Sequence, residues 1–178
     1  QPGKPINYAF RTLNFEGSTD QMIAFYQPTK GCLRLLSSAD SQDEFAAGHY
    51  YDFWHDVLPL SNPGQIDQDP AHAVTLDPQL FGKENKEQWC YYYEKASLAS
   101  QNKDWAETLR LYEQAHTKGF FPLNNAEYIP QIQAYLNLDK SAKALALVKN
   151  LPGVDSYENA SICKVLKTFQ AKTTQAAE

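Results

Sequence analysis

The second half of the chain carries apolar residues at the spacing of an α-helix. From residue 84 onward, bulky apolar and small side chains recur every three to four positions, as one buried helix face requires. Pro130 lies early in one of these segments and is expected to tighten its start, because proline cannot donate to the preceding turn. The pattern predicts five helices, at residues 86–101, 105–118, 126–137, 140–150 and 156–172.

The first half follows a different pattern. Residues 1–40 are rich in Ile, Tyr, Phe, Leu and Thr, interrupted by turn segments, which predicts a small antiparallel strand meander. A helix-period segment follows at about residues 41–57, and residues 61–83 form a Pro-rich loop that crosses between the halves. We therefore expect an α+β fold with a strand-helix subdomain at 1–83 and a helical subdomain at 84–178.

The helical half repeats at an offset of 36 residues. Residues of similar character coincide at this offset, namely Tyr92 with Tyr128, Ala96 with Ile132, Thr108 with Ala144 and Tyr112 with Val148. The pattern resembles the tetratricopeptide repeat, a helix-turn-helix unit of about 34 residues. In such stacked repeats the first helix of each pair lines a concave binding face. The resemblance implies a groove near Tyr93, Ser97, Gln101, Gln133 and Asn137.

The aromatic run that begins at Trp89 has two interpretations, a ligand-binding box or helix core. Trp89, Tyr92 and Tyr93 recur at helical spacing, which favours core packing. Tyr91 lies off that stripe and is the candidate for an exposed aromatic that stacks on a saccharide.

Charge and composition narrow the classes of partner. The formal net charge is −5, and no stripe of Lys and Arg stands out, which argues against a nucleic-acid partner. The longest apolar runs fall well short of the roughly 20 residues that span a bilayer. The chain begins with "QPGKP" rather than Met, and we expect it to be a piece of a longer protein.

Motifs that carry chemistry are not found in the sequence. It contains no Gly-rich phosphate loop and no GxSxG, HExxH or CxxC pattern. His49, Asp52 and Asp56 share one predicted helix face, but a solvated face is the commoner explanation of such a set. We expect no catalytic residues, no metal and no cofactor, so this fragment alone is not expected to be an enzyme.

The three cysteines permit at most one internal disulfide. Cys163 lies beside apolar residues in the last helix and is expected to be a buried thiol. Cys32 follows a turn glycine, and Cys90 lies in the first repeat helix. A Cys32–Cys90 bond and two separate buried thiols both remain open.

Several segments together resemble one family. They are "GCLRLL" at Gly31-Cys32, "LPLSNPG" at residues 58–64, and "WCYYYEKASLASQNKDW" from Trp89 to Trp105. They are similar to the C-terminal soluble region of bacterial polytopic membrane proteins of the glycosyltransferase-like, dolichyl-phosphate-mannose-protein mannosyltransferase-like type. The resemblance covers about residues 6–140, and "QNKDW" departs from the usual Gly-Asp-Trp.

The resemblance implies that a multispanning, membrane-embedded region precedes this chain and tethers it at the extracytoplasmic face of a bacterial membrane. That region would hold any glycosyltransferase activity, and none of its catalytic residues carries over. An extracytoplasmic site also favours the Cys32–Cys90 disulfide. The function expected is a non-catalytic domain that binds a protein partner or glycan acceptor. The alternatives are a saccharide-binding module that assists glycan transfer and a free-standing helical-repeat scaffold.

Overall fold

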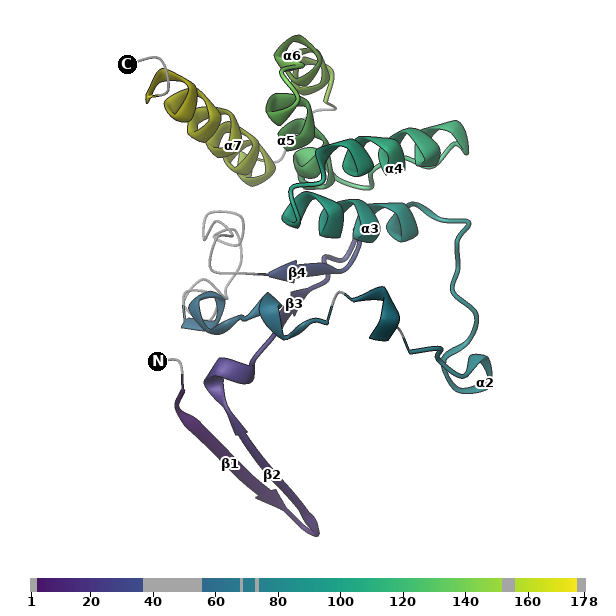
Figure 1. Cartoon of the computed structure of the whole chain (residues 1–178), viewed down its shortest axis with the longest axis vertical. Coiled ribbons are helices and arrows are strands. Elements are labelled where there is room, and N and C mark those ends of the chain that lie inside the picture. The colour runs from purple at the N-terminus through teal and green to yellow at the C-terminus, as the bar shows by residue number, and fades with distance from the viewer. Residues whose placement is uncertain (1–2, 37–55, 68, 73, 152–155, 176–178) are drawn as a thin grey trace. The chain divides into compact units, whose positions relative to one another are not determined.

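A computed structural model describes residues 3–36, 56–67, 69–72, 74–151 and 156–175. These residues form an α+β fold of two small antiparallel sheets and a set of helices, which confirms the expected fold class (Figure 1). The strands are β1 (Pro5–Phe10), β2 (Leu13–Ser18), β3 (Ala24–Tyr26) and β4 (Arg34–Leu36). The helices are α2 (Pro78–Phe81), α3 (Trp89–Gln101), α4 (Trp105–Thr117), α5 (Ile129–Asn137), α6 (Ser141–Lys149) and α7 (Ser156–Gln175).

The chain divides into two compact units. The first comprises Gln1–Tyr26 with Arg34–Glu84, and the second comprises Gln27–Leu33 with Asn85–Glu178. The main division after Glu84 lies one residue from the predicted boundary. The segment Gln27–Leu33 differs from the prediction, because this connection between β3 and β4 belongs to the helical unit.

The first unit contains two separate hairpins where the sequence predicted one meander. β1 pairs with β2, with Tyr8 opposite Phe15, and β3 pairs with β4. A 3-10 helix, η1 (Thr19–Gln21), turns the chain between the two sheets. Beyond it, the Met22 carbonyl accepts the Asn62 N–H at 2.8 Å, so a loop rather than a third strand pairs with the backbone there.

Ser61 ties the β3–β4 hairpin to the loop that follows residue 57. Its hydroxyl accepts the Ala24 N–H at 3.0 Å and donates to the Leu36 carbonyl. The adjacent side chains of Ala24, Leu36 and Leu58 are buried together as a small core. The "LPLSNP" segment is therefore structural in this unit, since its serine satisfies backbone groups of both strands.

The remaining part of the first unit differs in detail from the prediction. The helix expected at 41–57 lies outside the described residues except for its end at residues 56–57. The Pro-rich stretch expected to be irregular contains the 3-10 helices η4 (Pro63–Gln65) and η5 (Pro70–His72) and the single turn α2. Another 3-10 helix, η3 (Leu58–Leu60), precedes them.

The helical unit is built from antiparallel helices that pack in chain order. α3 packs on α4, α4 on α5, and α5 on α6, while α7 contacts α5 (Figure 1). The core of the first pair is aromatic and includes Trp89, Tyr92, Tyr93, Leu111 and Tyr112. The run that begins at Trp89 is thus largely helix core. None of the helices that the structure describes is long and apolar enough to cross a bilayer.

The turns of the two helix pairs repeat at the 36-residue offset. Lys103 in the first turn and Asp139 in the second both have left-handed φ angles, of 61° and 57°. The residue after each donates its N–H to a carbonyl five positions back, Asp104 to Ala99 at 2.9 Å and Lys140 to Tyr135 at 2.8 Å. Two pairs of side chains at the same offset are fully buried, Ala96 with Ile132 and Thr108 with Ala144. The turn geometry therefore repeats at this offset, but the match is incomplete. Tyr128 lies in the 3-10 helix η6 (Asn125–Tyr128) and is half-buried, whereas Tyr92 is buried in α3.

The predictions for Pro130 and Cys163 have different outcomes. A 3-10 helix, η6 (Asn125–Tyr128), precedes α5, and Pro130 lies in the first turn of α5, so the start of this helical segment is tightened as expected. Cys163, expected to be buried, is exposed. Its neighbour Ile162 is the residue that faces the core, and one position along a helix turns a side chain about 100° away.

Candidate functional site

The residues of the predicted groove lie mainly on α3 and α5, which contact each other. Ser100 on α3 donates its hydroxyl to Oε1 of Gln133 on α5 at 3.2 Å. Asn137 donates its amide to the Gln133 carbonyl at 2.8 Å. Gln101 and Asn137 are exposed, and Ser97 and Gln133 are half-buried. The structure therefore places polar side chains of α3 and α5, the first helices of the two pairs, next to each other.

Tyr93 does not belong to that groove. Its side chain is only 3% exposed, and its ring lies 6.1 Å from the ring of Trp89 within the core. The prediction that Tyr93 lines the open groove is therefore wrong. Tyr93 follows Trp89 by about one helical turn and lies on the same buried side of α3.

Tyr91 is half-buried rather than freely exposed. Lys95 Nζ lies 4.9 Å from the centre of its ring, and Lys86 Nζ lies 5.9 Å from it. The edge of the neighbouring Tyr92 ring also contacts Tyr91 at a centroid distance of 5.1 Å. Cations on an aromatic face are attracted by the ring quadrupole. A saccharide that stacked on Tyr91 would have to displace these lysine contacts.

A buried carboxylate, Glu127, is the main polar feature of the helical unit, and the sequence analysis did not identify it. The side chain is 1% exposed. Oε1 accepts the Cys32 N–H, and Oε2 accepts both the Trp89 indole N–H and the Leu123 N–H, each at 2.7 Å. Asn124, three residues earlier, caps the 3-10 helix η6 through the Glu127 N–H. Glu127 thus joins the Gly31-Cys32 segment, α3 and the α4–α5 connection.

Two further contacts surround Glu127. The Tyr112 hydroxyl donates to the Glu127 main-chain carbonyl, and burial raises the pKa of Tyr112, so it stays a protonated donor at neutral pH. Gly31 fits tightly beside the carboxylate. A Cβ at this position would lie 2.5 Å from Asn124 Nδ2 and 3.0 Å from Glu127 Oε1. The glycine of the Gly-Cys dipeptide is therefore required by close packing.

The structure joins Cys32 and Cys90 in a disulfide, the pairing that the sequence left open against two separate thiols. Their Cα atoms are 5.1 Å apart, within the usual range for such a bond. Cys90 follows Trp89, and the Cys32 N–H and the Trp89 indole both donate to Glu127. The disulfide and the carboxylate therefore fix the same two segments to each other.

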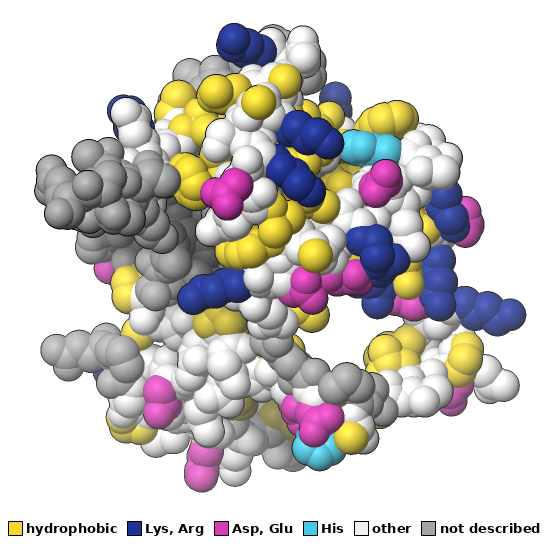
Figure 2. Space-filling model, turned by 45° about the horizontal axis from the view of Figure 1, so that its top comes forward, with side chains coloured by type: hydrophobic (Ala, Val, Ile, Leu, Met, Phe, Trp, Pro, Cys, Tyr) yellow, Lys and Arg dark blue, Asp and Glu magenta, His cyan; other side chains and the backbone are white. Residues whose placement is uncertain are grey.

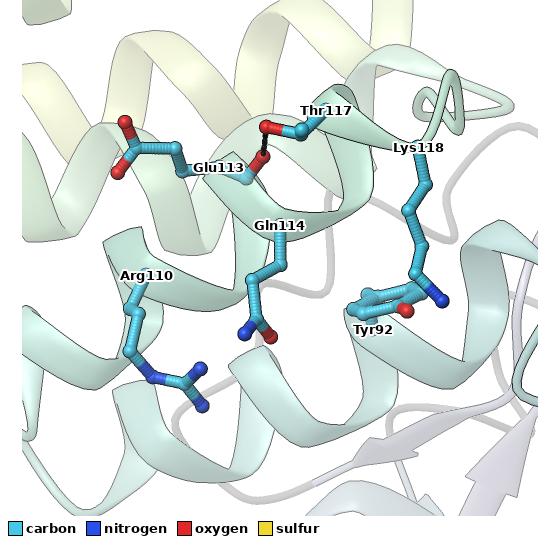
Figure 3. Close-up of a pocket in the computed structure, with 6 residues that line it drawn as sticks. All are labelled: Tyr92, Arg110, Glu113, Gln114, Thr117 and Lys118. Atoms are coloured by element: carbon cyan, nitrogen blue, oxygen red, sulfur yellow. Dashed lines mark hydrogen bonds between the residues drawn. The ribbon is translucent and has the colours of Figure 1, made fainter.

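A shallow depression of about 550 Å³ lies along the outer side of α3 and α4 (Figure 3). Arg110, Gln114 and Lys118 occupy one face of α4 at four-residue spacing, and Lys118 extends toward Tyr92 (Figure 3). Lys118 Nζ lies 3.0 Å from Glu87 Oε1 and 5.7 Å from the centre of the Tyr92 ring. These contacts, with Tyr92 the larger, raise the pKa of Lys118.

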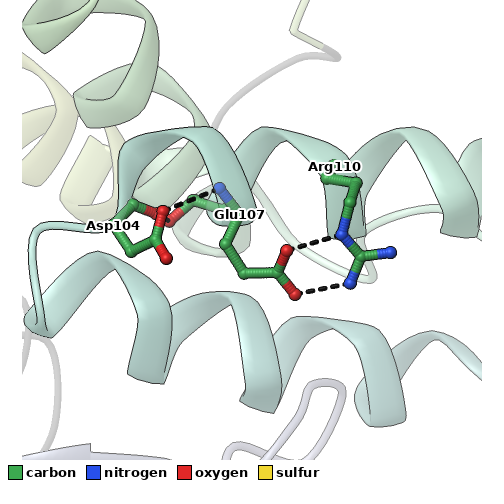
Figure 4. Close-up of polar contacts among 4 residues, drawn as sticks. Asp104, Glu107 and Arg110 are labelled. Carbon is green, nitrogen blue, oxygen red and sulfur yellow. Dashed lines mark hydrogen bonds and ion pairs between the residues drawn. The ribbon is translucent and has the colours of Figure 1, made fainter.

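The second cation of this depression is also paired. Arg110 forms a two-point ion pair with Glu107, one turn earlier on α4 (Figure 4). Hydrogen bonding to Arg110 lowers the pKa of Glu107. Asp104 caps the helix by accepting the Glu107 N–H at 3.0 Å. Because both cations already have acidic partners, the depression offers little unpaired positive charge to a ligand.

The described residues contain no group of three or more His, Cys, Asp or Glu side chains placed to hold a metal ion. On the face of the molecule drawn in Figure 2, basic side chains are interspersed with acidic and hydrophobic ones. The candidate sites are therefore polar surfaces and recesses rather than a reactive cluster.

Comparison with known proteins gives no relative: no protein-family model, no curated protein and no solved structure matches the chain.

Proposed function

We propose that this chain is a non-catalytic extracytoplasmic domain of a multispanning, glycosyltransferase-like bacterial membrane protein. Its helical unit binds a protein partner or the glycan acceptor through the face formed by α3 and α5. The observation that carries the binding role is the pair of exposed polar residues Gln101 and Asn137 on these two contacting helices, since stacked helical hairpins present such a face to partners.

The Cys32–Cys90 disulfide supports the placement outside the cytoplasm. Disulfides persist in oxidising compartments and are rare where thiols are kept reduced. The resemblance of the "GC", "LSNP" and "WCYY" segments to soluble regions of such membrane proteins points to the same side of the membrane.

The binding face can be tested by selecting peptides that bind the whole chain from a random displayed library. We expect selected peptides to lose about tenfold in affinity for a Gln101→Ala, Asn137→Ala double variant, since about 1.4 kcal/mol corresponds to a factor of ten. Gln114→Ala serves as the matched control, because Gln114 is exposed on α4, a helix outside the proposed binding face. Peptides that lose equal affinity for both variants would contradict the assignment of this face.

The saccharide-binding alternative depends on Tyr91. Neutral oligosaccharides titrated into the chain, followed by intrinsic fluorescence, would saturate in that case, and Tyr91→Ala would abolish the change. A separate assay addresses catalysis. The chain alone is expected to turn over no lipid-linked sugar, and turnover that a single substitution within residues 1–178 abolishes would refute the non-catalytic proposal.

A further inference from the structure

A second recess, of about 300 Å³, lies between α4, α5 and the start of α6. Its volume is at the lower end of the range of small-molecule sites, about 300–1,000 Å³. It includes none of the residues of the proposed α3–α5 binding face. Its lining side chains are Leu109, Glu113, His116, Thr117, Gln131, Tyr135, Lys140 and Lys143.

Two of the residues that line this recess each have a buried polar atom without a hydrogen-bond partner among the described residues. These atoms are Nε2 of His116 and Oε1 of Gln131. Gln131 is only 6% exposed, and the other end of its amide donates to the Tyr135 hydroxyl at 3.4 Å. A buried polar group left unpaired costs about 1–3 kcal/mol, and folded proteins have few of them. Two in one small recess indicate that a polar ligand completes their bonding.

The kind of atom that is unpaired defines part of the ligand. The amide oxygen of Gln131 can only accept, so it requires an O–H or N–H donor. Burial lowers the pKa of His116, which leaves a neutral imidazole whose Nε2 donates or accepts according to its tautomer. The His116 ring is held in place by a stack with Phe121, at a centroid distance of 5.1 Å. A hydroxyl group satisfies both requirements, since it is a donor and an acceptor.

The charged residues of the recess indicate the sign of the ligand's charge. Lys140 and Lys143 come from the start of α6 and are exposed. Neither has an ion-pair partner among the residues that the structure describes. Glu113 on α4 is the acidic residue of the lining, and it too is exposed. Two unpaired ammonium groups against one carboxylate favour an anion over a cation.

We propose that this recess binds a small hydroxylated anion of the size of a single sugar, either a sugar acid or a sugar phosphate. A ligand hydroxyl lies between Gln131 Oε1 and His116 Nε2, and the carboxylate or phosphate contacts Lys140 and Lys143. The proposal stands apart from the α3–α5 binding face, because the two sites share no residue.

Calorimetric titration of the whole chain with four probes tests the proposal. The probes are glucuronate, glucose 6-phosphate, glucose and inorganic phosphate. We expect at least one of the two sugar anions to bind tenfold or more tightly than both glucose and inorganic phosphate. The anion that binds more tightly identifies the ligand as a sugar acid or a sugar phosphate.

Three variants assign the binding to this recess. Gln131→Met removes the acceptor at nearly constant volume, and Lys143→Gln removes one charge at an exposed helix position. Each is expected to weaken binding about tenfold, because the first variant loses the bond to the ligand hydroxyl and the second loses an ammonium group beside the anion. Lys149→Gln, another exposed change on α6, is the matched control and should leave affinity unchanged. If Gln131→Met does not fold, Lys143→Gln and the control still decide the outcome.

The proposal is overturned if no probe binds saturably, or if inorganic phosphate binds as tightly as glucose 6-phosphate while glucuronate does not bind. It is equally overturned if Lys149→Gln weakens binding as much as Lys143→Gln. That last result would assign the attraction to the general charge of α6 and not to the recess.

Discussion

The indole Nε1 of Trp89 donates a hydrogen bond of 2.7 Å to Oε2 of Glu127, a carboxylate that is almost completely buried. The two residues are 38 positions apart and belong to different helix pairs. Among the described residues, the hydrogen bonds to the Glu127 side chain come from N–H donors. The contact therefore depends on a carboxylate at position 127 and on a donor at position 89.

Glu127→Gln should destabilise the helical unit by about 3 kcal/mol. In one orientation the glutamine NH₂ group would face the Cys32 N–H, and in the other it would face the N–H groups of Trp89 and Leu123. Either way, buried donors are left without an acceptor, which is costly. Urea denaturation measures the change. Glu113→Gln, an exposed substitution of the same kind, should stay within about 0.5 kcal/mol of the parent. Equal losses for the two variants would show that the buried network adds no stability.

Trp89→Phe isolates the indole bond. It should cost about 1–2 kcal/mol, and a double-mutant cycle with Glu127→Gln should return a coupling energy of about 1 kcal/mol. Additive losses in the cycle would mean that the two side chains act independently.

The disulfide makes a prediction about thiol content. Protein produced in an oxidising compartment should show one free thiol, that of Cys163, which is exposed and should react without unfolding. Cys32→Ser with Cys90→Ser should lower stability by about 4 kcal/mol in the loop-entropy model, given their sequence separation of 58. Three reactive thiols under denaturing, non-reducing conditions would exclude the bond.

His116 should make stability depend on pH. Burial lowers its pKa in the folded state, so below about 6.5 the unfolded chain binds a proton that the folded chain does not. The free energy of unfolding should therefore fall as the pH falls below about 6.5, until the folded-state pKa is passed. Melting temperatures between about pH 7.5 and 5.5 measure this slope.

His116→Phe keeps an aromatic ring at that position and should remove most of the slope. The charged groups of its recess, Lys140, Lys143 and Glu113, remain in place in this variant. A slope that persists in His116→Phe would assign the pH dependence to other groups.

Glycine substitutions should stabilise the protein in the turns of the two helix pairs and destabilise it within a helix. Lys103→Gly and Asp139→Gly should each stabilise the protein by about 0.5–1 kcal/mol, because a left-handed φ strains any residue with a Cβ. Lys143→Gly, in the first turn of α6, should instead destabilise the helix, by up to about 1 kcal/mol. Gly119→Ala, at a φ of 82°, should also destabilise. Thermal denaturation of the four variants would contradict the shared turn geometry if Lys103→Gly and Asp139→Gly changed stability in opposite directions.

Helix positions in the second half were predictable because burial there follows the helical period. The expected spans at 86–101 and 105–118 lie within three residues of α3 and α4 at each end. The 36-residue offset reflects the same periodicity, since a buried apolar residue recurs at Ala96 and Ile132. The strand half was harder, because two-stranded hairpins leave most side chains exposed and give little alternation.

The candidate sites were less accessible to sequence reasoning. Glu127 three residues after Asn124 has the spacing of a helix cap, and the cap is present, but its carboxylate bonds to segments far away in sequence. No local pattern encodes such long-range donors. Gln131 and His116 lie on different helices, so only the packing of α4 on α5 places them in one recess. The "GC" and "WCYY" segments were the available signal, because both contribute donors to Glu127.

The seven residues Gln27–Leu33 belong to the helical unit although the first unit surrounds them in sequence. The helical unit is therefore built from two separated stretches of the sequence. A swap or truncation at residue 85 would leave Cys90 without its partner and Glu127 without the Cys32 N–H. A chimaera that is to keep the disulfide and the Glu127 hydrogen bonds must therefore contain both Gln27–Leu33 and the residues from Asn85 onward.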